Sequence, residues 1–459
     1  MGSQLCKSKK GRWVMLRKVL MLMTIVLGVW ACSAQGGVID SNWVGGEWGD
    51  WETPSNWSPA IVPENGANTF NVTIDAGAGR VGVRLLYDHV INTLACKGNE
   101  VGLEGDGLSH VTLTLTDTNY APLTDNGELE ITGWGLEIFE IRGNVANSNG
   151  GLMDFWGGRV DGNLVNPAGA TIEVNGQLGI EGDCQNAGLV IVAPYHDFDV
   201  DQSLSNTGKI RIIGGGCGVG EVLVNDTEGE ITGFGVLYGG ERLTNAGTIR
   251  ATGGNLAAAT GAEGVFQNEG TLANAAMSLL NVSHLNLLHY GSWVPSDVNN
   301  TGTVEVNAGG GVAFDCNLVN EPNGVIELLG GTLSATTITQ AADANFAGFG
   351  TITGDVVIEP NGLIQLTGPT NIVGDMQIGT AATLEISDGT TLITGYTTNN
   401  GTIHMKGGRI IPQGGFTNNA NIIWEPGPYN NIADFNLDGQ VNFKDFADFA
   451  DTWLWQAQL

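Results

Sequence analysis

The chain has 459 residues, enough to bury a large core, and its 71 glycines are about twice ordinary usage, whereas only 14% of its residues are charged. The formal net charge is −30, so the surface would repel nucleic acids and anionic membranes and attract cations. This charge balance excludes nucleic acid as an expected partner.

The first 34 residues are typical of a secretory signal peptide. Six of the 18 basic residues precede residue 19, and the apolar run from Val19 to Trp30 is too short to span a bilayer comfortably. Cleavage is expected at the small residues ending at Ala34, and lipid attachment at Cys32 is the alternative. We therefore expect a secreted or cell-surface protein with no transmembrane segment after signal removal, in which 12 bases remain against 48 acids, a formal charge of −36.

Residues 35–75 stand apart because four tryptophans fall within 15 residues, at Trp43, Trp48, Trp51 and Trp57. The segment resembles the Trp-Gly, Asn-Trp and Pro pattern that opens many secreted bacterial β-solenoid proteins. We expect it to cap the first coil, because the end of a solenoid exposes strand edges that need covering. The alternative is that exposed indoles stack on sugar rings.

Residues 76–425 repeat a unit of about 20 residues that reads as turn, short strand and turn. In the copy at 243–254, Asn245 and Gly247 are residue types that tolerate positive φ, so they are expected to form the corner. Ile249 and Ala251 then alternate with polar residues, which predicts a strand with one buried face. Equivalent asparagines recur along the chain: Asn126, Asn147, Asn166, Asn186, Asn206, Asn225, Asn245, Asn268, Asn300, Asn320, Asn399 and Asn419.

A fixed step near 20 residues predicts an all-β solenoid of about 15–17 stacked coils. The repeats resemble the right-handed parallel β-helix family, which includes pectate lyases, polygalacturonases and filamentous haemagglutinin-type adhesins. The resemblance implies the architecture and not the activity. Two places break the rhythm: an insertion at 275–298 that carries His284, His289 and Trp293, and the stretch between Asn320 and Asn399. In the second, Gly348 stands at the expected asparagine position.

The four cysteines of the repeats are expected to be mostly buried free thiols. An exported protein could oxidise them, but the 33-residue separation of Cys184 and Cys217 places these two at different positions of their coils. One disulfide among Cys96, Cys184, Cys217 and Cys316 is left open.

Carboxylates also recur with the coil period. Asp161, Glu181 and Asp201 each lie five residues before an asparagine, so stacked coils would place them in one column about 4.8 Å apart. Asp197 and Asp199 share a strand face with Asp201. Carboxylates this close raise one another's pKa or recruit a cation.

A glycoside hydrolase needs two carboxylates at a defined separation in unlike environments. The weak catalytic candidates are therefore Glu181, Asp197, Asp199 and Asp201, and a solvated acidic face is the alternative. A lyase resembling pectate lyases would also need a base near calcium, for which Lys209 and Arg211 are nearest by count.

After a linker at 426–431, residues 432–459 match a calcium loop that runs into one helix. Hard cations take oxygen ligands, and the loop from Asp434 to Asp445 offers them at the expected spacing. Gly439 permits the sharp turn. The predicted Ca²⁺ ligands are Asp434, Asn436, Asp438, Gln440, through its backbone carbonyl, Asn442, through water, and Asp445.

This loop and the helical spacing of Phe446, Phe449 and Trp453 resemble one repeat of a type I dockerin, an EF-hand-like module. In the family, two repeats bind a cohesin module, and only one is found here. The sequence therefore favours an exported structural, adhesive or scaffold protein with a calcium-dependent tail that docks to a cohesin-like or cell-surface protein. The alternative is a polysaccharide-active enzyme or a glycan-binding protein.

Overall fold

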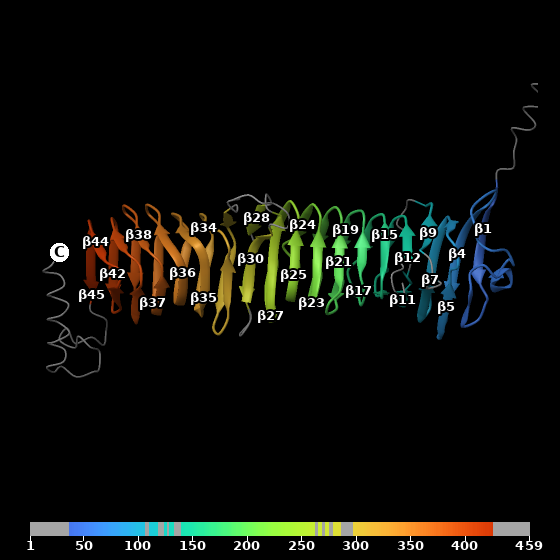
Figure 1. The fold of residues 1–459 in the computed structure, drawn as a ribbon, viewed down its shortest axis with the longest axis horizontal. Coiled ribbons are helices and arrows are strands. Elements are labelled where there is room, and N and C mark those ends of the chain that lie inside the picture. Colours follow the sequence, from blue (N-terminus) through green and yellow to red (C-terminus); the bar gives the residue numbers. More distant parts are fainter. Residues whose placement is uncertain are drawn as a thin grey trace, which may run out of the picture.

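The computed structural model describes residues 36–105, 110–117, 124–125, 128–132, 139–261, 265–268, 271–274, 279–285 and 297–425. These residues form a parallel β-solenoid of about 15 turns, seen in Figure 1 as a long rod with β1 and β45 at opposite ends. No helix among them is long and apolar enough to cross a membrane. The predicted signal, most of the 275–298 insertion and the calcium loop lie outside the described residues.

The coils place their strands on three faces, and each strand pairs in parallel with its equivalents one coil away. The first face holds β2 (Trp48–Asp50), β5 (Arg80–Arg84), β8 (Glu100–Glu104), β11 (Glu128–Thr132), β14 (Leu152–Phe155), β17 (Thr171–Val174), β20 (Leu189–Val192), β29 (Thr271–Asn274), β32 (Thr303–Asn307), β39 (Thr383–Ile386), β42 (Thr402–Lys406) and β45 (Asn421–Glu425).

The second face holds β6 (His89–Ile91), β9 (Val111–Leu115), β12 (Phe139–Arg142), β15 (Gly158–Asp161), β18 (Leu178–Ile180), β21 (Asp197–Val200), β30 (Leu279–Leu285), β33 (Gly311–Phe314), β40 (Thr390–Ile393) and β43 (Arg409–Pro412). The third holds β13 (Val145–Ala146), β16 (Leu164–Asn166), β19 (Cys184–Asn186), β22 (Leu204–Asn206), β24 (Val222–Asn225), β26 (Arg242–Asn245), β28 (Val265–Asn268), β31 (Val298–Asn300), β34 (Leu318–Asn320), β38 (Met376–Ile378), β41 (Thr397–Asn399) and β44 (Phe416–Asn418).

Six longer strands bend across the corners from face to face: β23 (Lys209–Val219), β25 (Glu230–Gly239), β27 (Thr248–Gly261), β35 (Val325–Gln340), β36 (Asn345–Ile358) and β37 (Leu363–Val373). The first coils add a five-stranded sheet of β1 (Val38–Trp43), β3 (Trp57–Ser58), β4 (Thr69–Asp75), β7 (Thr93–Lys97) and β10 (Thr124–Asp125).

The alternation of apolar and polar residues sets which side of each strand faces the core, as the sequence predicts. In β27, Ile249 and Ala251 are fully buried, while Thr248 and Arg250, which alternate with them, are partly exposed. In-register stacking places like residues above one another, so a single apolar core runs along the rod.

The recurrent asparagines are core residues and not corner residues. From Asn147 to Gln340 each buried side-chain amide donates to the next coil's amide oxygen at 2.6–3.2 Å, which forms an asparagine ladder. Asn225 has no exposed surface, and its Nδ2 also donates to the backbone oxygens of Gly229 and Thr248. The ladder satisfies polar groups that would otherwise be stranded in the core.

The predicted reason for these asparagines is therefore wrong in one respect. Asn245 is the last residue of β26, with its side chain in the core, and is not among the described residues with positive φ. Gly247 is required for a different reason, since a Cβ there would lie 2.1 Å from the backbone oxygen of Gly229 in the preceding coil.

Two positions of the repeat also need correction. Between Asn320 and Asn399 the equivalent residues are Gln340, Ile358 and Ile378, whereas Gly348 pairs with Leu328 and Leu366 on the first face. Beyond Asn399 the ladder continues to Asn418 and not to Asn419.

The tryptophan-rich segment packs into the first coil. Trp43, Trp51 and Trp57 are at most 8% exposed and meet edge to face, with ring centroids 4.7–5.0 Å apart. After the short 3-10 turn Pro54–Asn56, β3 pairs antiparallel with the free edge of β1. Three of the four indoles are therefore core residues of the first coil, and only Trp48 is half exposed.

The four cysteines of the repeats are buried free thiols, as expected, and the disulfide left open is not formed. Burial raises the pKa of the Cys96 and Cys184 thiols to about 12, so both are held in the unreactive protonated form.

Candidate functional site: a charged column on the second face

The structure brings together the three carboxylates that the sequence places in one column. Asp161 ends the second-face strand of its coil, whereas Glu181 and Asp201 directly follow theirs. The backbone N–H of Glu181 and of Asp201 donates to the preceding coil at the same register. Asp161 and Glu181 share a side-chain hydrogen bond. The pKa of Glu181 is raised by burial and by this bond to Asp161, while Arg159 opposes the rise.

Two arginines interleave with this column, and sequence reasoning missed both. Arg159 pairs with Glu181 and lies 3.9 Å from Asp201, so one guanidinium spans carboxylates of two later coils. Arg142 pairs with Glu140 at 2.8 Å and lies 3.5 Å from Asp161.

Lys209 and Arg211, the expected bases, lie instead on the first face. They pair in register with β20 and β25, where Lys209 meets Glu230 at 3.1 Å. Their proximity by residue count does not bring them to the carboxylates, because a coil turns the chain onto another face between residues 201 and 209.

The second-face carboxylates of β21 lie beside a strip of glycine. Asp199 is in register with Gly179 and Gly218, and a Cβ at Gly218 would lie 2.5 Å from Asp199 Oδ1. Glycine therefore makes room for this carboxylate to lie flat over the next coil. The pKa of Asp199 is raised, mainly by burial and then by the charge of Asp197, with a smaller contribution from Asp201.

We predict that Asp199→Asn stabilises the protein at neutral pH. Because the folded carboxyl has a raised pKa, it binds its proton more tightly than the unfolded chain does, so stability falls as pH rises above about 4. Asparagine removes this loss. Thermal unfolding should show a higher midpoint for the variant at pH 7 and equal midpoints near pH 3. Glu359→Gln, on an exposed turn, should change neither, and equal midpoints at pH 7 would contradict the prediction.

The column has limited chemistry available. Across the described part of the chain, no group of three or more His, Cys, Asp or Glu side chains converges as a metal site. Glu181 is the best candidate for a protonated acid, and Asp201 is exposed on the next coil, about 4.8 Å further along the rod.

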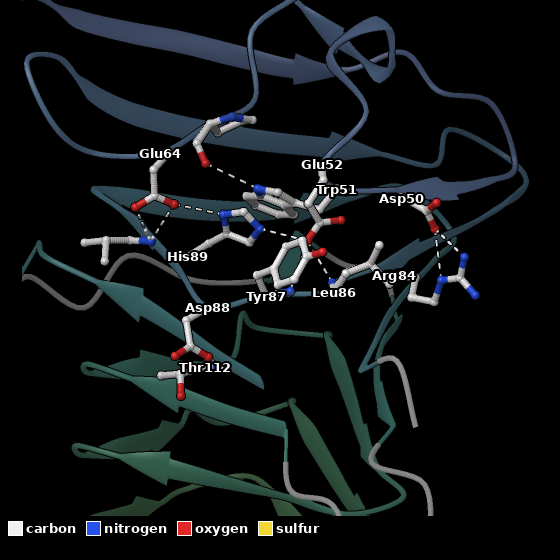
Figure 2. A network of polar contacts seen from close by, with 12 residues as sticks. Asp50, Trp51, Glu52, Glu64, Arg84, Leu86, Tyr87, Asp88, His89 and Thr112 are labelled. Carbon is white, nitrogen blue, oxygen red and sulfur yellow. Dashed lines mark hydrogen bonds and ion pairs between the residues drawn. The ribbon is translucent and has the colours of Figure 1, made fainter. Parts of the chain in front are cut away.

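A second polar cluster, which no spacing in the sequence indicated, ties the tryptophan-rich segment to the second coil (Figure 2). His89 is 6% exposed and lies between two carboxylates, with Nδ1 2.8 Å from Glu64 Oε2 and Nε2 3.0 Å from Glu52 Oε1. Trp51 packs over the imidazole, with ring centroids 5.4 Å apart. Glu52 Oε1 also accepts the backbone N–H groups of Leu86 and Tyr87.

This second cluster holds segments of the chain together and is not an open site. Each ring nitrogen of His89 lies within hydrogen-bond distance of one carboxylate, and Figure 2 shows the imidazole between Glu52 and Glu64. We call Glu52, Glu64 and His89 the histidine clasp.

Aromatic residues are exposed where the first face turns into the second. Trp156 is 52% exposed, and its Nε1–H donates to Asp154 Oδ2, which also fixes the indole's orientation. Tyr195 is 95% exposed and lies at the same corner two coils further on. The two rings therefore lie along one corner of the rod at a separation of about two coils, roughly 10 Å.

Comparison with known proteins returns no match: no protein-family model, no curated protein and no solved structure matches this chain.

Proposed function

We propose that the protein is an exported, non-catalytic rod that presents an adhesive or scaffold surface, with a calcium-dependent tail at 432–459 for docking. The observation that carries this proposal is the pairing within the charged column. Asp161 lies beside Arg142, and Arg159 spans Glu181 and Asp201. Carboxylates that are ion-paired along the rod in this way favour a binding surface. A glycosidase would instead hold a catalytic acid and a catalytic base apart, on either side of the substrate.

A glycan is the ligand that the exposed corner supports best. Exposed aromatic faces beside carboxylates and amides suit sugar rings, which offer C–H groups to the ring and hydroxyls to the polar neighbours. Trp156 with Asp154, followed by Tyr195 two coils on, would contact an extended chain at intervals of about one disaccharide. An acidic surface favours a neutral polysaccharide over a polyuronate.

A polysaccharide-active enzyme is the second candidate, and the raised pKa values of Glu181 and Asp199 favour it. Incubation of the mature protein with neutral and acidic polysaccharides in calcium should give binding without new reducing ends. Binding should weaken at least tenfold in Trp156→Ala with Tyr195→Ala. The matched control is Tyr396→Ala, which removes another exposed tyrosine at the corner between the second and third faces.

If the protein releases new sugar ends and Asp201→Asn abolishes this release, the protein is an enzyme and the proposal of a non-catalytic rod is wrong. If binding survives the loss of both corner aromatics, Trp156 and Tyr195 do not form the glycan-binding site. The scaffold role would then rest on the other faces of the rod.

A further inference from the structure

The C-terminal end of the described solenoid leaves part of its core uncovered. In β42 the inward-facing residues Ile403 and Met405 are at most 6% exposed, as is usual along this rod. In β45 the residues at the same register, Ile422 and Trp424, are 42% and 58% exposed. Burial of such side chains stabilises a protein by about 1.5–3 kcal/mol each, so covering Ile422 and Trp424 would stabilise this end of the solenoid.

The backbone at this end is also open. Among the described residues, β43, β44 and β45 each pair with one strand only, namely β40, β41 and β42 (Figure 1). An unpaired edge beside an exposed apolar surface invites another chain, and solenoids avoid this with a terminal cap.

The opposite end shows how this chain solves the same problem. There, β3 folds back along the edge of β1, and Trp43 and Trp57 are at most 8% exposed. The covering element is an aromatic-rich segment that is adjacent in sequence to the coil it covers.

We propose that residues 432–459 cover the C-terminal end of the solenoid by laying the stripe Phe446, Phe449 and Trp453 on Ile422 and Trp424. The spacing of the three aromatics places them on one side of a helix, and no other stretch after β45 offers an apolar stripe of this kind. The inference goes beyond the proposed function and does not require the tail to bind calcium.

Tethering favours this segment over a second copy of the protein. Eight residues separate Glu425 from Asp434, which limits their distance to about 30 Å. Two prolines in this linker, Pro426 and Pro428, stiffen it. A segment held so close has an effective concentration in the millimolar range, far above that of another rod in solution.

Hydrogen exchange of the full chain tests the proposal. Amides of β44 and β45 should exchange slowly in the wild type and at least tenfold faster in Phe446→Ser with Phe449→Ser. Gln456→Ser with Gln458→Ser alters the same segment outside the stripe and should leave exchange unchanged. The protection should be equal at two protein concentrations tenfold apart.

Rapid exchange of β44 and β45 in the wild type would overturn the proposal. Protection that appears only at the higher concentration would overturn it in favour of a second copy. A calcium titration of Asp434→Ala with Asp438→Ala tests the predicted calcium loop separately. Loss of calcium binding with retained protection of β44 and β45 would support a cap that folds without the metal. Neither the exchange measurement nor the calcium titration bears on the polysaccharide assay.

Discussion

Asn225→Ala is expected to open the middle of the solenoid at a cost of about 3 kcal/mol or more. Asn225 Nδ2 donates to Asn245 Oδ1 at 2.7 Å, and its Oδ1 accepts from Asn206 at 2.7 Å. Alanine removes both bonds inside a core with no exposed surface at this position. Each buried polar group left without its partner costs about 1–3 kcal/mol, and at least two are left here.

Hydrogen exchange of β22, β24 and β26 measures this cost as a free energy of local opening. Asn317→Ala is the matched control, because Asn317 also bonds across one coil, to Asp297 at 2.9 Å, but on the exposed surface. That variant should cost less than about 1 kcal/mol. Equal costs for the two variants would show that the ladder contributes no more than a surface contact.

The period of the ladder could be predicted from the sequence, but its role could not. Asparagine suits both a corner and a buried amide stack, and only the register across coils separates the two. The same limit explains the residues that were missed. Gln340 continues the ladder because its longer side chain accepts from Asn320, and its Nε2 then turns to the backbone oxygen of Ala344.

Ile358 and Ile378 then occupy the equivalent position without stranding a polar group, since Gln340 has already satisfied the last amide. A search for asparagine cannot find such a substitution. Asn419 was chosen in place of Asn418 for a related reason, because the spacing alone does not tell which of two adjacent asparagines ends the strand β44.

The charged column was predicted in part. Stacking of Asp161, Glu181 and Asp201 followed from counting back from the asparagines, since the coil length is nearly constant. Arg159 was missed because it lies one coil before Glu181 and two coils before Asp201. Residues this far apart in sequence are not compared when charges are examined only among sequence neighbours. Interactions of this kind need the register, which the sequence implies only after the ladder residues are correctly identified.

The histidine clasp has no periodic signal at all. Its members are 25 and 37 residues apart in sequence and come from two loops and a strand that meet only after the first coil has folded. Glu52 follows β2, Glu64 lies between β3 and β4, and His89 begins β6. The clasp thus joins the tryptophan-rich cap to the second coil at a place where Trp51 already packs on the imidazole.

His89→Ala is expected to detach this cap, with a cost to local stability of about 1–3 kcal/mol. The substitution removes the imidazole partner of the Glu52 and Glu64 carboxylates, and Glu52 Oε2 is already buried without a hydrogen-bond partner. A buried polar group left without its partner has a cost of this size, and Glu52 is the more buried of the two carboxylates. Exchange of the amides in β1, β4 and β6 should rise accordingly, while that of β37 to β42 should not change.

His110→Ala is the matched control. His110 also meets a carboxylate, Glu140, at 2.6 Å, but its side chain is 51% exposed and Arg142 continues to pair with Glu140. Its cost should stay below about 1 kcal/mol, and an equally small effect at His89 would mean that the tryptophans hold the cap without the clasp.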